Sequence, residues 1–373
     1  MRASTAKFGE AGVPPNQGLP EPNGPASLHF EALAIRLFSL QFQHNPAYRR
    51  FCLERGSRPE NLSTWREIPA MPTAAFKELE VSCLPPEERT TVFFSSGTSR
   101  QPRSRHFHGE ESLAIYEASL WPWFRRHCLA QNAAMELLLL TPSEAEAPGS
   151  SLVYMLDTVR KNLNQPETVF AGRIEQDGAW TLDFDAVLSA LEASATTKRP
   201  LFIAGTAFLF MHLLDHLAGL NLRFELPPGS RVMETGGYKG RARALPREEL
   251  HGSIAERFGI ARSQIVREYG MSELSSQAYA VSPGSGRPFF RFPPWARAQI
   301  VSPETGQEAG EGEPGLIRVF DLANVYSVMA IQTEDLGVRQ ADGFELLGRA
   351  TLAEPRGCSL MSDTNELAEL LPG

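Results

Sequence analysis

The chain has 373 residues, of which 42% are hydrophobic and 21% are charged, and its formal net charge is −8. This length suggests two or three structural units and allows a sizeable core without disulfides or metals. The composition excludes a disordered chain, a collagen-like repeat and a disulfide-rich miniprotein. The acidic balance argues against a nucleic-acid-binding surface, so we expect no nucleic acid among the partners.

The cysteines and the hydropathy pattern predict the compartment. None of the four cysteines lies in a CxxC pair, and their spacing fits neither a zinc site nor a disulfide framework. This usage is typical of a reducing compartment. No run of about 18 apolar residues could span a membrane, and the N-terminus lacks the apolar core of a signal peptide. We therefore expect a cytoplasmic protein without a membrane span.

The N-terminal part of the chain predicts a leader followed by helices. Residues 1–27 are rich in proline and glycine, which favours a flexible leader. Ser27 is a plausible N-cap for a helix from Leu28 to about Gln43, and a second helix is expected from about Ala47 to Leu53.

Apolar runs and helical patterns then alternate along the chain. Strands are predicted at 90–94, 137–141, 201–204, 231–234 and 265–269, and helices at 110–128, at 206–218 and from Pro246 to a C-cap at Gly259. This alternation predicts an α/β core over 28–291 with a mostly parallel sheet flanked by helices. Later β-like runs at 297–301, 315–320, 326–331 and 344–347 predict a β-rich subdomain over 292–360, before a short tail at 361–373.

A loop of small residues, most of which carry a hydroxyl group, follows the strand predicted at 90–94. Its sequence is Ser95-Ser96-Gly97-Thr98-Ser99. Backbone N–H groups and hydroxyls in such a loop can bind phosphate oxygens, and Arg103 could neutralise phosphate charge. The loop is not a Walker P-loop, because no GK(S/T) follows a GxxxxG. The alternative is an ordinary polar turn.

Two more loops follow strands, at the sheet edge where parallel sheets bind ligands. Gly236 and Gly237 would let a flat ligand lie against bare backbone. The segment Tyr269-Gly270-Met271-Ser272-Glu273 ends in a carboxylate that we expect to be exposed. Glu273 is therefore a candidate single-carboxylate ligand for Mg²⁺. Either loop could also be a simple surface turn.

Two later segments complete the set. Thr333-Glu334-Asp335 is expected to follow an apolar run, and Asp335 could accept hydrogen bonds from a ribose diol. The second segment is Gly348-Arg349, which follows Asp335 in the chain. Taken singly, both segments read as solvated turns.

The order of these segments resembles the adenylate-forming superfamily, which includes acyl-CoA ligases, luciferase and peptide-synthetase adenylation domains. Its phosphate loop typically reads S/T-S/T-G-S/T-S/T-G-x-P-K. Here Pro102 matches, Arg103 replaces the lysine and Arg100 replaces the second glycine. The segments that resemble the acyl-protein synthetases of the LuxE type more closely are 93–99, 234–239, 267–273 and Arg356-Gly357-Cys358-Ser359-Leu360. That resemblance covers roughly residues 85–360.

The resemblance implies a fold like the N-terminal domain of adenylate-forming enzymes, without the small C-terminal domain. It implies a ligase that uses ATP and Mg²⁺ to convert a carboxylic acid, fatty or other acyl, to an acyl-AMP with release of pyrophosphate. A cysteine thiol would then receive the acyl group. Cys358 is the candidate, with a small buried cysteine as its alternative, and a reductase or carrier protein would be the final acceptor.

The resemblance also implies roles for single residues. Pyrophosphate would be bound by Ser95, Thr98 and Arg103, adenine would be framed by Gly236, Gly237 and Tyr269, and ribose would be held by Asp335 and Arg349. The nucleotide site would also include Ser96, Gly97, Ser99, Gly270, Met271 and Ser272. Lys239 could reach phosphate or the substrate carboxylate, and either His106 or His108 could gate the carboxylate site. Two other functions stay open: an adenylating enzyme that loads a separate carrier protein, coenzyme A or an amine, and a degenerate nucleotide-binding regulatory module.

Overall fold

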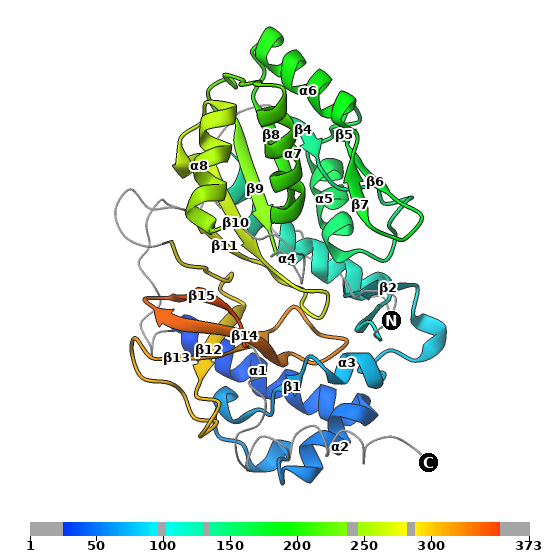
Figure 1. Cartoon of the computed structure of the whole chain (residues 1–373). Coiled ribbons are helices and arrows are strands. Elements are labelled where there is room, and N and C mark those ends of the chain that lie inside the picture. The colour runs from blue at the N-terminus through cyan, green and yellow to red at the C-terminus, as the bar shows by residue number, and fades with distance from the viewer. Residues whose placement is uncertain (1–24, 96–101, 130–134, 237–244, 282–287, 351–373) are drawn as a thin grey trace.

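The computed structural model describes residues 25–95, 102–129, 135–236, 245–281 and 288–350. Two main sheets organise this part of the chain, one of six strands and one of five. Figure 1 shows the six-stranded sheet with its helices above the five-stranded sheet, which turns β14 and β15 toward it.

The six-stranded sheet has the order β11-β10-β9-β8-β4-β5. Its strands are β4 (Glu136–Leu139), β5 (Val169–Phe170), β8 (Leu201–Thr206), β9 (Arg231–Thr235), β10 (Ile265–Tyr269) and β11 (Ala278–Val281). Only the β10–β11 pair is antiparallel, and the other neighbours are parallel. The expected mostly parallel sheet is therefore confirmed.

Helices cover both faces of this sheet because its strands are apolar on both sides. Met233 and Val266 face a core that they share with α4 (Glu110–Cys128) and α5 (Ser151–Asn162). Val232 and Ile265, one residue earlier on each strand, face the opposite core. That core is shared with α6 (Phe184–Thr197), α7 (Ala207–Gly219) and α8 (Arg247–Phe258). Gly259 caps α8 with a φ of 63°, as predicted.

The five-stranded sheet is built from β12 (Ala296–Val301), β13 (Pro314–Asp321), β14 (Ala330–Gln340), β15 (Gly343–Arg349) and the short β1 (Met71–Pro72). β1 pairs with β14 in parallel, whereas the later strands pair antiparallel. The expected run at 326–331 enters a strand only at Ala330. Residues 326–329 instead lie in the irregular connection before β14, where Asn324 Nδ2 donates to the Val328 carbonyl at 2.8 Å.

The N-terminal helices pack on this second sheet. α1 (Pro25–His44) and α2 (Pro46–Glu54) contribute Phe38 and Tyr48 to the core that holds Ile317 and Val319. α1 begins three residues before the predicted start, so Ser27 lies inside the helix and is not its N-cap. The N-cap of α2 is Asn45, whose side chain accepts a hydrogen bond from the Tyr48 N–H.

Smaller elements complete the described chain. α3 (Ala75–Glu78) follows β1, and two short hairpins form from β2 (Thr91–Phe94) with β3 (Arg105–His108) and from β6 (Gly172–Ile174) with β7 (Trp180–Leu182). None of the helices in the described ranges is both long and apolar enough to cross a membrane.

Candidate functional site

The hydroxyl-rich loop joins β2 to β3. Residues Ser96, Gly97, Thr98 and Ser99 lie outside the described residues, but both ends of the loop are described. Arg103 Nε donates to the Ser95 carbonyl at 2.8 Å, and the Ser104 N–H donates to Ser95 Oγ at 2.9 Å. The Arg103 guanidinium also lies 4.9 Å from the centre of the Phe94 ring. These contacts close the base of the loop and keep an exposed arginine beside it.

His106, on β3, ties this hairpin to the loop after β10. Its Nδ1 lies 2.7 Å from the Ser272 carbonyl, 166 residues away in sequence. Burial lowers the pKa of His106 to about 4, so the ring is neutral near neutral pH. Because a carbonyl can only accept, Nδ1 carries the proton. Burial and the nearby His106 lower the pKa of His108 to about 2, and the two rings lie 4.2 Å apart.

Glu273 is buried and not exposed as the sequence predicted, with 5% relative exposure. Ser272 Oγ donates to its carboxylate at 2.9 Å, and Asn324 Nδ2 donates to its carbonyl at 2.9 Å. The loop is buried because its neighbours Met271 and Leu274 pack into the core of the five-stranded sheet. Asp321 holds the next turn, since it accepts hydrogen bonds from the backbone N–H groups of Ser275 and Ser276.

Asp335 lies within β14 and not in the turn that the sequence predicted. The Tyr269 hydroxyl donates to Asp335 Oδ2 at 2.9 Å, and Arg349 Nε lies 3.7 Å from Asp335 Oδ1. Arg349 stands directly opposite Asp335 in the β14–β15 ladder. The Asp335 N–H donates to Thr333 Oγ1 at 3.1 Å, which fixes the start of this segment. The structure thus brings Tyr269, Asp335 and Arg349 together.

Gly236 follows the carboxyl end of β9 in the left-handed region, with a φ of +69°. A Cβ at this position would meet no atom of the described residues within 4 Å, so this part of the chain leaves the Gly236 backbone open on one side. Gly237 and Lys239 lie outside the described residues. A Cβ at Gly270 would collide with Glu268 Oε1, so the Glu268 side chain would have to move to admit a larger residue there.

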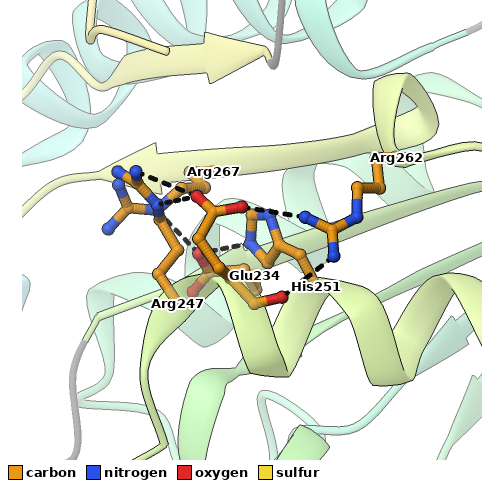
Figure 2. Close-up of polar contacts among 6 residues, drawn as sticks. Glu234, Arg247, His251, Arg262 and Arg267 are labelled. Carbon is orange, nitrogen blue, oxygen red and sulfur yellow. Dashed lines mark hydrogen bonds and ion pairs between the residues drawn. The ribbon is translucent and has the colours of Figure 1, made fainter. Parts of the chain in front are cut away.

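Sequence reasoning missed one group of residues at this edge. Glu234 on β9, Arg267 on β10 and His251 on α8 form a buried polar cluster, which we call the Glu234 cluster (Figure 2). The sequence did carry one signal, because Glu234 is a charged residue at the end of an apolar strand. A glutamate buried at such a position is almost always paired, which would have predicted a partner for it.

Three cysteines fall in the described chain, and all three are free thiols. Burial raises the pKa of Cys52 and of Cys83 to about 12, and it raises the pKa of Cys128 well above its usual value. Cys358 lies outside the described residues. Within the described ranges no group of three or more His, Cys, Asp or Glu side chains is placed to hold a metal ion.

Comparison with known proteins finds a matching family and a related ligase. A family model described as acyl-protein synthetase, LuxE, matches residues 27–366. A long-chain-fatty-acid–luciferin-component ligase of Aliivibrio fischeri is 23% identical over 350 residues, which cover 88% of this chain and 86% of the relative.

A solved structure of a ligase shares the fold. The structure of a 2-hydroxyisobutyryl-CoA ligase in the postadenylation state, in complex with 2-HIB-AMP, matches with a TM-score of 0.64 at 14% identity. The match covers 92% of this chain and 73% of that one. ATP-bound MatB from Rhodopseudomonas palustris matches with a TM-score of 0.49 at 17% identity, over 71% of this chain. The chain spans about half of the length of that structure, 49%.

Proposed function

Because the chain belongs to the acyl-protein synthetase (LuxE) family and is a ligase of that family, we propose that it activates a carboxylic acid with ATP. One observation carries this proposal: the segment 269–273 contacts both the β2–β3 hairpin, which holds the hydroxyl-rich loop, and β14. His106 meets Ser272 at 2.7 Å, and Tyr269 meets Asp335 at 2.9 Å. These contacts link candidate groups for phosphate, metal and ribose that are far apart in sequence, which supports a single site.

The proposed first step is the formation of an acyl-AMP. A carboxylate oxygen of the acid attacks the α-phosphorus of ATP, the bond to the β-phosphate breaks, and pyrophosphate leaves with the bonding electrons. Arg103 and the loop that begins at Ser95 bind the pyrophosphate and stabilise its charge. Asp335 accepts hydrogen bonds from the ribose, and Arg349 holds Asp335 in place. In this proposal the late β-rich segment completes the nucleotide site.

Glu273 fits the requirements of a magnesium site. Mg²⁺ in proteins is usually held by one or two carboxylates together with substrate phosphates, so it needs no three-residue cluster. The buried Glu273 supplies such a carboxylate, and its neighbour Ser272 orients one oxygen. Bound Mg²⁺ would neutralise phosphate charge, and we assign Glu273 as its protein ligand.

We propose a fatty or other acyl acid as the substrate. The relative from Aliivibrio fischeri is named a ligase of long-chain fatty acids, and it aligns over most of both chains. This similarity, at 23% identity, is the basis for proposing an acyl acid as the class of substrate.

We further propose that the acyl group passes to the thiol of Cys358 and then to a partner protein, a reductase or a carrier protein. A thiolate is the reactive form of cysteine. The three described cysteines are poor nucleophiles because burial raises the pKa of each. Among the four cysteines of the chain, this leaves Cys358 as the candidate. Reduced, unpaired thiols also fit a cytoplasmic location.

A trapping experiment tests the proposed function. The protein is incubated with ATP, Mg²⁺, hydroxylamine and one acid at a time from a panel of fatty, aryl and amino acids. An acid that is activated yields its hydroxamate together with AMP. Formation of a hydroxamate from one acid class supports the proposal and identifies that class. Absence of any hydroxamate, with ATP still bound, would favour a nucleotide-binding regulatory module.

A further inference from the structure

The Glu234 cluster lies at the carboxyl end of β9, where Glu234 comes two residues before Gly236. Arg267 Nε donates to Glu234 Oε1 at 2.8 Å, and His251 Nε2 lies 3.3 Å from the same oxygen. Glu234 and His251 each have 3% relative exposure, and the Arg267 side chain has 16%. Figure 2 shows Glu234 between Arg267 on the neighbouring strand and His251 on the helix.

The register of the two strands places this pair at a defined position. Glu234 stands opposite Arg267 in the parallel β9–β10 ladder, one step before the carboxyl end of each strand's pairing. The next pair, Thr235 and Glu268, is also joined by a side-chain hydrogen bond. Because side chains alternate along a strand, the two pairs lie on opposite faces of the sheet. Polar side-chain contacts on both faces of the sheet therefore fix the last two residue pairs of β9 and β10.

The cluster continues into the proposed nucleotide site. The Arg267 guanidinium lies 4.9 Å from the centre of the Phe290 ring. Phe290 stacks on Phe344, and both rings contact Tyr269 at centroid distances of 5.7 and 5.2 Å. Tyr269 in turn holds Asp335. An unbroken series of contacts thus runs from α8 through β9 and β10 to Asp335.

We propose that Glu234 is a positioning residue for nucleotide binding. It fixes the carboxyl ends of β9 and β10 relative to each other through Arg267 and His251. The Gly236 turn and the Tyr269–Asp335 pair thereby keep the separation that ATP requires. A buried carboxylate of this kind leaves an uncompensated arginine charge when it is removed, so its loss moves the groups around it. This inference rests on the proposed function, because it assigns Glu234 to the ATP half of the same site.

The test compares Glu234→Gln with Glu248→Gln. The first variant keeps the shape of the side chain and removes its charge. Glu248 on α8 offers a matched control, because it pairs with Arg262 at 2.8 Å and with Arg247 at 3.1 Å but is exposed. Exposed ion pairs contribute little to stability. Initial rates of acid-dependent AMP formation give KM for ATP, KM for the acid and kcat for each variant.

We expect Glu234→Gln to raise the KM for ATP about fivefold or more while the KM for the acid stays within about twofold. Glu248→Gln should match the wild type. A purely structural role would lower kcat through a smaller folded fraction and leave both KM values unchanged, and that result would overturn the inference. If Glu234→Gln does not fold, Glu234→Asp is measured instead, and an unchanged KM for ATP overturns the inference in the same way. A wild-type protein without AMP formation would contradict the proposed function itself, so the two failures are distinguishable.

Discussion

The Tyr269 hydroxyl donates a 2.9 Å hydrogen bond to Asp335 Oδ2 and so joins the carboxyl end of β10 to β14 of the other sheet. Burial and the charge of Asp335 raise the pKa of Tyr269 well above its usual value, so the hydroxyl stays protonated and remains a donor. Asp335 keeps Oδ1 on the side of Arg349, at 3.7 Å. A carboxylate held at the junction of two sheets is suited to accept hydrogen bonds from a ribose diol.

The role of Asp335 predicts a nucleotide-specific defect. Asp335→Ala should raise the apparent KM for ATP about tenfold or more and lower turnover several-fold, because hydrogen bonds to a charged group are among the strong ones. Steady-state rates of AMP formation measure both constants. Glu304→Ala is the control, since that carboxylate is exposed and lies in the turn after β12. An unchanged KM in Asp335→Ala would contradict the ribose role.

The proposed acyl transfer predicts a covalent intermediate on a single cysteine. After incubation with ATP and the activated acid, intact mass should increase by one acyl group, and hydroxylamine should remove it as expected for a thioester. Cys358→Ala should abolish the mass increase without affecting acid-dependent AMP formation in hydroxylamine. Cys83→Ala is the matched control, because burial raises the pKa of that thiol to about 12. Retention of the adduct in Cys358→Ala would assign it to another group.

Four of the six strands of the larger sheet, β4, β8, β9 and β10, could be predicted from the sequence because local patterns determine them, whereas β5 and β11 were missed. The strand at 265–269 and the helix that ends at Gly259 agree with the structure. The packing of α1 and α2 on the late sheet could not be predicted, since an apolar helix face does not specify which sheet will cover it. The small β1 strand was missed for a similar reason, because two residues carry no periodicity.

In the candidate site, too, local motifs could be predicted from the sequence, whereas features that depend on long-range packing could not. Short motifs identified Tyr269, Asp335 and Arg349, and the structure brings these three together. Their surroundings depend on long-range contacts, so the burial of Glu273 and the strand conformation at Asp335 were predicted wrongly. The Glu234 cluster was missed, because its three members lie on three different elements and form no motif.

The buried His106 predicts a pH dependence of stability. Its folded pKa is lowered to about 4 from an ordinary value of 6.5. Between these values the unfolded chain binds a proton that the folded chain does not, so the free energy of unfolding falls as the pH drops from about 6.5 to about 4. At about 1.4 kcal/mol for each pKa unit, His106 alone would account for a loss on the order of 3 kcal/mol.

Substitution isolates this contribution of His106. His106→Gln can keep a donor for the Ser272 carbonyl but cannot gain a proton in this range. Urea unfolding at pH 7 and pH 5 should therefore show a smaller loss of unfolding free energy for His106→Gln than for the wild type. His44→Gln, at an exposed position, should behave like the wild type. Equal losses in all three proteins would contradict a neutral buried ring at His106.

The assignment of Glu273 predicts a changed metal requirement. Glu273→Gln should raise the Mg²⁺ concentration for half-maximal AMP formation about tenfold or more, because the amide removes a negatively charged ligand. The measurement is a Mg²⁺ titration at saturating ATP and acid. High Mg²⁺ should restore part of the activity if the fold is intact. A titration curve that coincides with that of the wild type would remove Glu273 from the metal site.

Acid-dependent exchange of labelled pyrophosphate into ATP tests the central claim most directly. The exchange requires reversible formation of an acyl-AMP and does not depend on Cys358 or on a partner protein. We predict exchange with at least one fatty or other acyl acid, its loss without the acid, and its severe reduction in Asp335→Ala. Absence of exchange with every acid, by a protein that still binds ATP, would contradict adenylation as the chemistry of this chain.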